Sequence, residues 1–187
     1  MKNYLKLLGA VAATSILASC GGSGSDGDVV YTSFGTITSD GEALDLKYAG
    51  EAETAFIDLP DIDGATYQGF VGGDLTGGDL DQREIIGQLT LEVDFATPDV
   101  VDGDAYNFLL DDSSELPGEL TLASGLIQEN GSNVAEINAD LTGELNGDQT
   151  DIALIGTFLG DQYEAVEGGV IGDVGDSALS GGFIAER

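Results

Sequence analysis

From Val29 to the C-terminus, apolar side chains tend to recur at every second position, and this alternation constrains the fold more than any other feature of the chain. In the segment GQLTLEVDF, for example, Leu89, Leu91 and Val93 alternate with polar residues. Successive side chains of a strand point to opposite faces, so this period predicts a sheet with one apolar and one solvated face. No window of eleven or more residues shows a convincing helical repeat. We therefore expect an all-β fold with almost no helix.

Eight alternating runs follow one another closely from Ala65 on. Consecutive, closely spaced strands are typical of an up-and-down barrel or of a two-sheet sandwich. Closure removes every exposed edge, so we predict a single eight-stranded antiparallel up-and-down β-barrel, with an interior filled by side chains or holding one small ligand. The runs span residues 65–72, 84–95, 104–110, 118–127, 134–145, 150–159, 164–172 and 178–186.

Turn and bend residues support this fold. Asn130-Gly131 and Asn146-Gly147 each lie between two alternating runs. Because Asn-Gly readily supplies two positive φ values, both pairs predict type I′ hairpin turns and therefore antiparallel neighbours. Glycines within the runs, such as Gly87, Gly143 and Gly168, fit a closed barrel because they permit bulges and sharp coiling.

The sequence predicts one folded domain with short appendages. Its 187 residues, of which 42% are apolar, are enough for one modest core. Residues 29–64, which include YTSFGTI and ALDLKYAG, are expected to form a short N-terminal β element that covers the barrel or extends one side of it. The remaining boundaries are a lipoprotein signal peptide over residues 1–19, a lipidated cysteine with a flexible tether over 20–28, and the barrel over 65–187.

The N-terminus has the layout of a bacterial lipoprotein signal. A basic start is followed by an apolar run too short to span a membrane, and then by Leu17, Ala18, Ser19 and Cys20. These four residues resemble a lipobox, in which cleavage precedes a cysteine that carries diacylglycerol and a further acyl chain. Cys20 is the only cysteine. From the lipoprotein resemblance, Gly21 favours sorting to the outer membrane, with the domain on either the cell surface or the periplasmic face.

Acidic residues dominate the charge. The chain has 35 Asp and Glu against 5 Lys and Arg, which gives a formal net charge of −30. Such a surface repels nucleic acid and anionic membrane surfaces and attracts cations. Adaptation to salty surroundings, where screening reduces self-repulsion, is favoured over a dedicated cation-binding role.

Side chains suited to catalysis are scarce. The sequence has no His, and its one Cys is assigned to the lipid. Only Lys47 could act as the base for a Ser or Thr nucleophile, and no SxxK motif surrounds it. A zinc ligand set is therefore absent. The sequence predicts a protein that is not an enzyme and has no catalytic residue, metal site or cofactor.

Calcium is the one ion that two segments suggest. LPDIDG, residues 59–64, has part of the spacing of an EF-hand loop, but Leu59 and Phe70 occupy positions that need acidic ligands. GGDLTGGDLDQ, residues 72–82, resembles one glycine-aspartate repeat, whereas calcium β-helices need several. A long acidic loop between the first two barrel strands is favoured, and a calcium-dependent surface module stays an alternative.

Two C-terminal motifs carry a family resemblance. GTFLGDQYEAVEGG is similar to G-x-F-x-G followed by A-E-x-x-G-G, and SGGFIAER resembles a closing G-x-F-G-x-x-R. With the lipobox and the strand pattern, they resemble the β-barrel domain of the transferrin-binding protein B superfamily of surface lipoproteins. The likeness covers about residues 30–187. The matching positions are Gly156, Phe158, Gly160, Glu164, Gly168, Gly169, Gly181, Phe183 and Arg187.

The resemblance implies a non-enzymatic, outer-membrane-anchored binding module for a protein or small ligand, with an outer-membrane receptor or an extracellular protein as partner. The motif residues are structural in that family, so they mark the fold rather than a ligand site. Acidic loops at residues 72–83 and 110–118 are where we expect a partner to bind, because binding functions tend to lie on loops. A structural or protective envelope lipoprotein without a specific ligand is the alternative.

Overall fold

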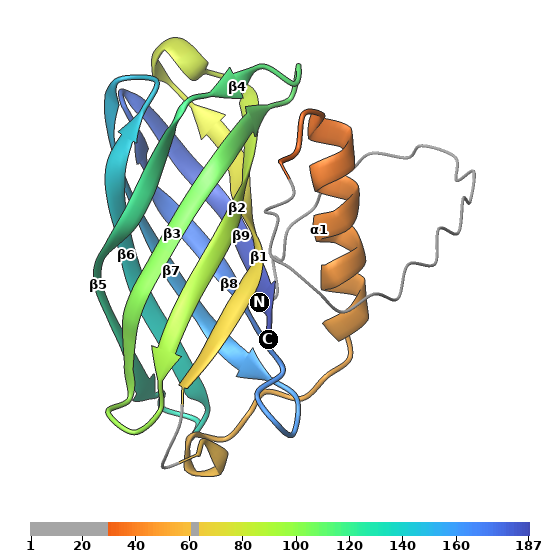
Figure 1. The fold of residues 1–187 in the computed structure, drawn as a ribbon, viewed down its shortest axis with the longest axis vertical. Coiled ribbons are helices and arrows are strands. Elements are labelled where there is room, and N and C mark those ends of the chain that lie inside the picture. The colour runs from red at the N-terminus through yellow and green to blue at the C-terminus, as the bar shows by residue number, and fades with distance from the viewer. Residues whose placement is uncertain (1–29, 61–63) are drawn as a thin grey trace.

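The computed structural model describes residues 30–60 and 64–187, and within them nine strands and one α-helix of 15 residues. The helix, α1, stands beside the barrel wall (Figure 1). Of the two 3₁₀ turns, η1 (Phe56–Asp58) lies between α1 and β1, and η2 (Gly78–Leu80) lies between β1 and β2. The other elements are α1 (Phe34–Tyr48), β1 (Gly64–Thr76), β2 (Arg83–Asp94), β3 (Asp99–Leu110), β4 (Glu115–Leu116), β5 (Gly118–Glu129), β6 (Ala135–Leu145), β7 (Asp148–Leu159), β8 (Ala165–Val174) and β9 (Ser177–Glu186).

The strands close into one antiparallel barrel. Each long strand pairs with its neighbour in sequence, and β1 pairs with both β2 and β9, so the first and last strands join. The two-residue strand β4 pairs only with the end of β3 and adds a ninth member outside the ring. All eight runs predicted from the sequence are strands of this barrel, and the predicted all-β barrel is confirmed.

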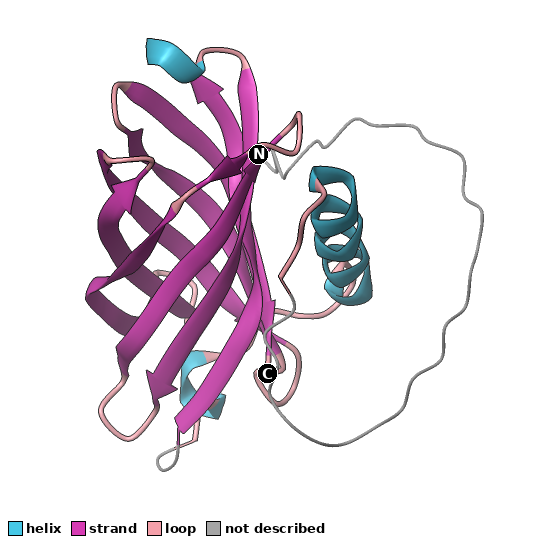
Figure 2. Ribbon diagram, turned by 45° about the horizontal axis from the view of Figure 1, so that its top comes forward, coloured by secondary structure: helices cyan, strands magenta, loops and turns pink. Residues whose placement is uncertain are grey.

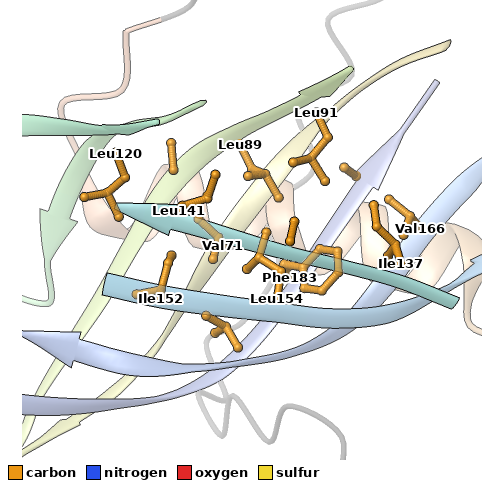
Figure 3. Close-up of a cluster of buried hydrophobic side chains, with 14 of the residues drawn as sticks. Val71, Leu89, Leu91, Leu120, Ile137, Leu141, Ile152, Leu154, Val166 and Phe183 are labelled. Atoms are coloured by element: carbon orange, nitrogen blue, oxygen red, sulfur yellow. The ribbon is translucent and has the colours of Figure 1, made fainter. Parts of the chain in front are cut away.

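Apolar side chains fill the inside of the barrel. The residues that alternate in the sequence, such as Leu89, Leu91, Ile137 and Leu141, are almost fully buried and belong to one continuous cluster (Figure 3). Aromatic rings close one end, where Phe158 makes edge contacts with Tyr67 and Phe95. The hydroxyl group of Tyr67 donates a hydrogen bond to the carbonyl oxygen of Tyr163 at 2.8 Å. The sequence allowed an interior filled by side chains or one that holds a small ligand, and the structure has an interior filled by side chains.

The Asn-Gly turns differ from each other. Asn146 and Gly147 have φ values of 54° and 88°, as a type I′ turn requires, and they join β6 to β7. Asn130-Gly131 also joins two antiparallel strands, but the positive φ falls on Asn133 instead. There the side-chain oxygen of Asn130 accepts hydrogen bonds from the N–H groups of Ser132 and Val134, which widens the turn. The hairpin prediction is confirmed, and the type I′ assignment at Asn130-Gly131 is wrong.

The expected N-terminal β element is wrong for most of its length. The segment that contains YTSFGTI and ALDLKYAG forms α1, which packs against Phe70 of β1 and Ile86 of β2. Figure 2 shows the helix on the outside of the barrel. Phe34, Ile37, Gly41, Leu44 and Tyr48 follow one another at spacings of three and four, the period of one helical face. The segment forms a helix rather than a strand because its apolar residues share one helical face, which is buried against the barrel.

After α1 the chain crosses one end of the barrel in an extended form. Glu53 and Ala55 form isolated bridges to Leu159 and Val134. The N–H of Thr54 donates to the carbonyl oxygen of Phe158 at 2.8 Å. These bonds hold the connection against β6 and β7, so the expected β character survives only here. Pro60 is the last described residue before β1, and residues 1–29 and 61–63 lie outside the described part of the chain.

Candidate functional site

Helix α1 divides the outer face of the barrel into two grooves. Its buried residues Ile37, Gly41 and Leu44 meet the wall along one line. A Cβ on Gly41 would lie 3.5 Å from the ring of Phe70 and 3.7 Å from Ile86, so glycine lets the helix approach the sheet closely. A groove lies on each side of this line, and both are outside the barrel interior.

The first groove, called the tyrosine groove, has a volume of about 590 Å³. The hydroxyl of Tyr31 donates to a carboxylate oxygen of Asp40 at 2.8 Å, and the Tyr31 ring meets Phe70 edge-on. Burial, followed by this hydrogen bond, raises the pKa of Tyr31 to about 12, so its proton stays in place at neutral pH. The other residues that line the groove are Ala43, Leu44, Lys47, Gln68, Gly69, Gln88, Leu89, Thr90, Tyr106 and Glu186.

Polar contacts anchor α1 at both ends of this groove. Near its start, the Asn107 amide accepts from the N–H of Tyr31 at 2.7 Å and donates to the Tyr31 carbonyl oxygen at 3.0 Å. Near its end, the Lys47 ammonium group and the Tyr48 hydroxyl both donate to one carboxylate oxygen of Glu186. Burial acts to raise the pKa of Glu186, but hydrogen bonds from these two residues outweigh it and lower the pKa. The helix is therefore fixed to β3 and β9 by side chains.

The second groove, called the glycine groove, has a volume of about 530 Å³ and a floor without side chains. Gly72, Gly182 and Gly169 are directly opposite one another on β1, β9 and β8 and face outward. The row continues to Ile86 on β2 and Ile155 on β7, whose side chains stand at its two ends. Ile86 is covered by α1, whereas Ile155 is 47% exposed. Three successive strands thus present bare backbone to the solvent.

Carboxylates surround the glycine groove, and no cationic side chain from residues 30–60 or 64–187 lines it. From residue 30 on, the chain has three cations, and each has a partner elsewhere. Lys47 pairs with Glu186, Arg83 pairs with Asp111 and Asp112, and the Arg187 guanidinium lies 4.6 Å from the ring centre of Tyr163. Six acids of the groove therefore receive no neutralising Lys or Arg side chain from the described residues. They are Glu42, Asp45, Glu53, Asp74, Glu84 and Glu136, and Glu167 lines the groove as well.

Each groove also contains a buried oxygen without a hydrogen-bond partner among the described residues. The hydroxyl oxygen of Thr38 on α1 lines the glycine groove, and the amide oxygen of Gln88 on β2 lines the tyrosine groove. A buried polar atom without a partner costs stability, and most such atoms are satisfied in folded proteins. Both oxygens mark positions where a bound molecule can supply the missing donor.

The motif residues found in the sequence lie on β7, β8 and β9, in the turn between β7 and β8, and directly after β9. Gly156 is opposite Gly168, and Gly168 is opposite Phe183, so the three form one row inside the barrel. Gly160 has a φ of 85°, and the carboxylate of Glu164 folds over it, so that a Cβ there would lie 1.9 Å from a Glu164 oxygen. Their packing agrees with a structural role, which stays a prediction, and one motif residue lies differently. Gly169 faces outward into the glycine groove.

The predicted binding loops are smaller than expected. Residues 72–76 belong to β1, so the acidic loop before β2 consists of residues 77–82 and contains η2. The segment 110–118 contains β4, and Arg83 pairs there with two acids of the β3–β4 connection. Sequence reasoning missed the grooves because they depend on α1. The sequence signal for these grooves was the recurrence of apolar residues and Gly41 at spacings of three and four across residues 34–48, which indicates a helix.

Other predictions concern ions and the membrane. Across residues 30–60 and 64–187, no group of three or more acidic, His or Cys side chains is placed to hold a metal. Part of the LPDIDG segment lies outside these ranges. The lipobox residues Leu17, Ala18, Ser19 and Cys20 lie wholly outside them. None of the described helices is long and apolar enough to cross a membrane.

Comparison with protein-family models and with curated proteins finds no match for this chain. The closed barrel is shown by the structure, and the resemblance to the transferrin-binding protein B superfamily stays a prediction.

Proposed function

We propose that this protein is an outer-membrane-anchored lipoprotein that acts as a non-enzymatic binding module through the grooves beside α1. The observation that carries the proposal is the arrangement of the wall. The barrel interior is filled with side chains, whereas the outer wall and α1 enclose two grooves of about 590 and 530 Å³. Volumes of this size are typical of small-molecule sites. The grooves, rather than the loop tips, are thus the places for a ligand.

The anchor part of the proposal rests on the lipobox ending in Cys20. It is tested by labelling cells with a radioactive or alkyne fatty acid and comparing the protein with its Cys20→Ser variant. The protein is expected to take up the label and to fractionate with the outer membrane, and the variant is expected to do neither. Lipid labelling that persists in the variant contradicts the assignment.

The binding part is tested by thermal stability. A ligand that binds only the native state raises the melting temperature as its concentration rises. We expect a screen of small molecules of different charge to give such shifts for the protein, and smaller shifts when a groove is filled by substitution. If no class of molecule gives a groove-dependent shift, the structural envelope role is the better account. A calcium titration in the same assay tests the calcium-dependent alternative.

A further inference from the structure

We infer that the glycine groove binds a small organic cation with an apolar body, such as an amine or a quaternary ammonium compound. The inference rests on the proposed binding function and names its ligand class. It follows from the missing side chain at Gly169, the charge of the groove, and its apolar surfaces.

Gly169 is the residue that packing does not explain. A Cβ on Gly72 would lie 2.3 Å from the carbonyl oxygen of Ile85, so glycine is required there. At Gly169, the nearest atom to such a Cβ is the Gly181 carbonyl oxygen at 3.9 Å, which is ordinary contact distance. The pairing of β8 with β7 and β9 has no bulge at this position, and glycine weakens a strand. The remaining use of a strand glycine is close approach of another molecule to the backbone.

The charge of the groove selects the sign of that molecule. Seven carboxylates line it, whereas no Lys or Arg side chain of the described residues does, and the acids come from α1, from the connection after it and from several strands of the wall. Hydrogen bonds from Asn138 and Gln128 lower the pKa of Glu136, so this acid stays ionised even in mildly acidic solution. Like charges at one site repel each other, and a cation that enters relieves this repulsion. An anion meets only repulsion.

The size and apolar surfaces of the groove select the rest of the molecule. From Gly72 to Ile155 the floor crosses three strand spacings, which is about 14 Å. Phe34 of α1 and Phe70 of β1 line the groove at one side, and Ile155 lies at its far end. Aromatic faces attract quaternary and protonated amines. The Thr38 hydroxyl oxygen, which has no partner among the described residues, can accept a hydrogen bond from a protonated amine, whereas a quaternary ammonium group has no N–H to donate to it. A hydrated metal ion would leave these apolar surfaces unused.

The test is calorimetric titration of the purified protein with benzyltrimethylammonium. Gly169→Leu places a side chain over the floor, and its Cβ would have ordinary contact distances, so it should weaken binding at least about tenfold while the fold is retained. The matched control is Ala178→Leu, an exposed position on β9 outside the groove, which should leave the affinity unchanged. Equal affinity in the two variants overturns the inference.

Charge is tested with a matched pair of double variants. Glu42→Gln with Asp45→Asn removes two groove carboxylates, and Glu92→Gln with Glu119→Gln removes two exposed ones elsewhere. The first pair should weaken binding at least about fivefold, and the second should have little effect. Equal effects show diffuse attraction to an acidic surface and overturn the inference.

Probe chemistry separates the ligand class from the binding role. Tetramethylammonium, which lacks the ring, and benzyl alcohol, which lacks the charge, should both bind more weakly than benzyltrimethylammonium. If a lysine-rich peptide binds in a Gly169-dependent way and the benzyl cation does not, the occupant is a basic peptide and the inference is wrong. If a neutral or anionic molecule from the screen binds instead, the inference fails while the proposed binding function stands.

Discussion

The ring of Phe183 lies over Gly156 inside the barrel. A Cβ on Gly156 would come within 2.8 Å of the Phe183 Cζ atom and within 2.2 Å of the carbonyl oxygen of Glu167. Phe183 is 4% exposed and belongs to the main core cluster. A large side chain on one strand thus fills the space that a glycine leaves on another, as small barrels require for a packed interior.

Two neighbouring glycines on β8 should respond to substitution in opposite ways. In Gly168→Val the new Cβ would lie 2.1 Å from the Ile155 carbonyl oxygen, so we expect a loss of at least about 1–3 kcal/mol in the free energy of unfolding. Gly169→Val has open space and gains strand propensity, so its stability should stay equal or rise by up to about 1 kcal/mol. Urea unfolding of both variants checks this. Equal destabilisation would show that the two strand faces are not as described.

Asn107 should control the attachment of α1. Its amide makes both hydrogen bonds to the Tyr31 backbone, and its φ of 51° is one that asparagine tolerates better than alanine. Asn107→Ala is expected to cost about 1–3 kcal/mol and to raise amide hydrogen exchange in α1 more than in the barrel strands. Asn133→Ala is the control, because Asn133 has a φ of 63° but makes no side-chain hydrogen bond to α1 or to the described residues before it. If α1 exchanges alike in the two variants, Asn107 does not hold the helix.

Acid should weaken the other end of the helix. The lowered pKa of Glu186 means that its charged form is favoured in the folded state, so its contribution is present above the ordinary pKa of a glutamate and is lost as pH falls through the folded value. Melting curves of the protein and of Glu186→Gln should therefore differ at neutral pH and converge in strongly acidic solution. A difference that does not depend on pH would assign the effect to packing. Glu119→Gln, which removes an exposed acid on β5, controls for overall charge.

Salt should stabilise the protein. Thirty-five acids face only five cations in the whole chain, so repulsion between carboxylates outweighs attraction within the few ion pairs. Sodium chloride between about 0.05 and 0.5 M shortens the range of this repulsion and should raise the melting temperature. The surface pair of Arg83 with Asp111 contributes little by comparison. A melting temperature that falls over this range would mean that ion pairs dominate.

The barrel could be predicted because the features that determine it, strand alternation and turn residues, are local in the sequence. Alternation at Leu89, Leu91 and Val93 fixes which face is buried, and the Asn146-Gly147 turn fixes an antiparallel neighbour. Short connections then leave few other ways to bury all eight strands. The type I′ turn at Asn130 failed because the Asn130 side chain bonds the backbone of its own turn and shifts the positive φ to Asn133.

The helix and the site were harder to predict. Gly41 stands at the centre of the face of α1 that meets the wall, so the apolar period across residues 34–48 is interrupted where the packing is closest. The glycine groove combines Gly72, Gly169 and Gly182, which are remote in sequence and become neighbours only through barrel closure. The sequence motif grouped Gly169 with the inward-facing Gly168, because no local sequence signal distinguishes a glycine that faces into the barrel from one that faces outward.

The most direct test of the site is an NMR titration of isotope-labelled protein with benzyltrimethylammonium. Backbone amide signals of glycine lie in a separate region of the spectrum, so the groove floor can be followed residue by residue. We predict saturable shifts at Gly72, Gly169 and Gly182 together with Thr38. Shifts confined to the acidic loop of residues 77–82, or no saturable shift at the three glycines, would contradict the assignment of the groove as the binding site.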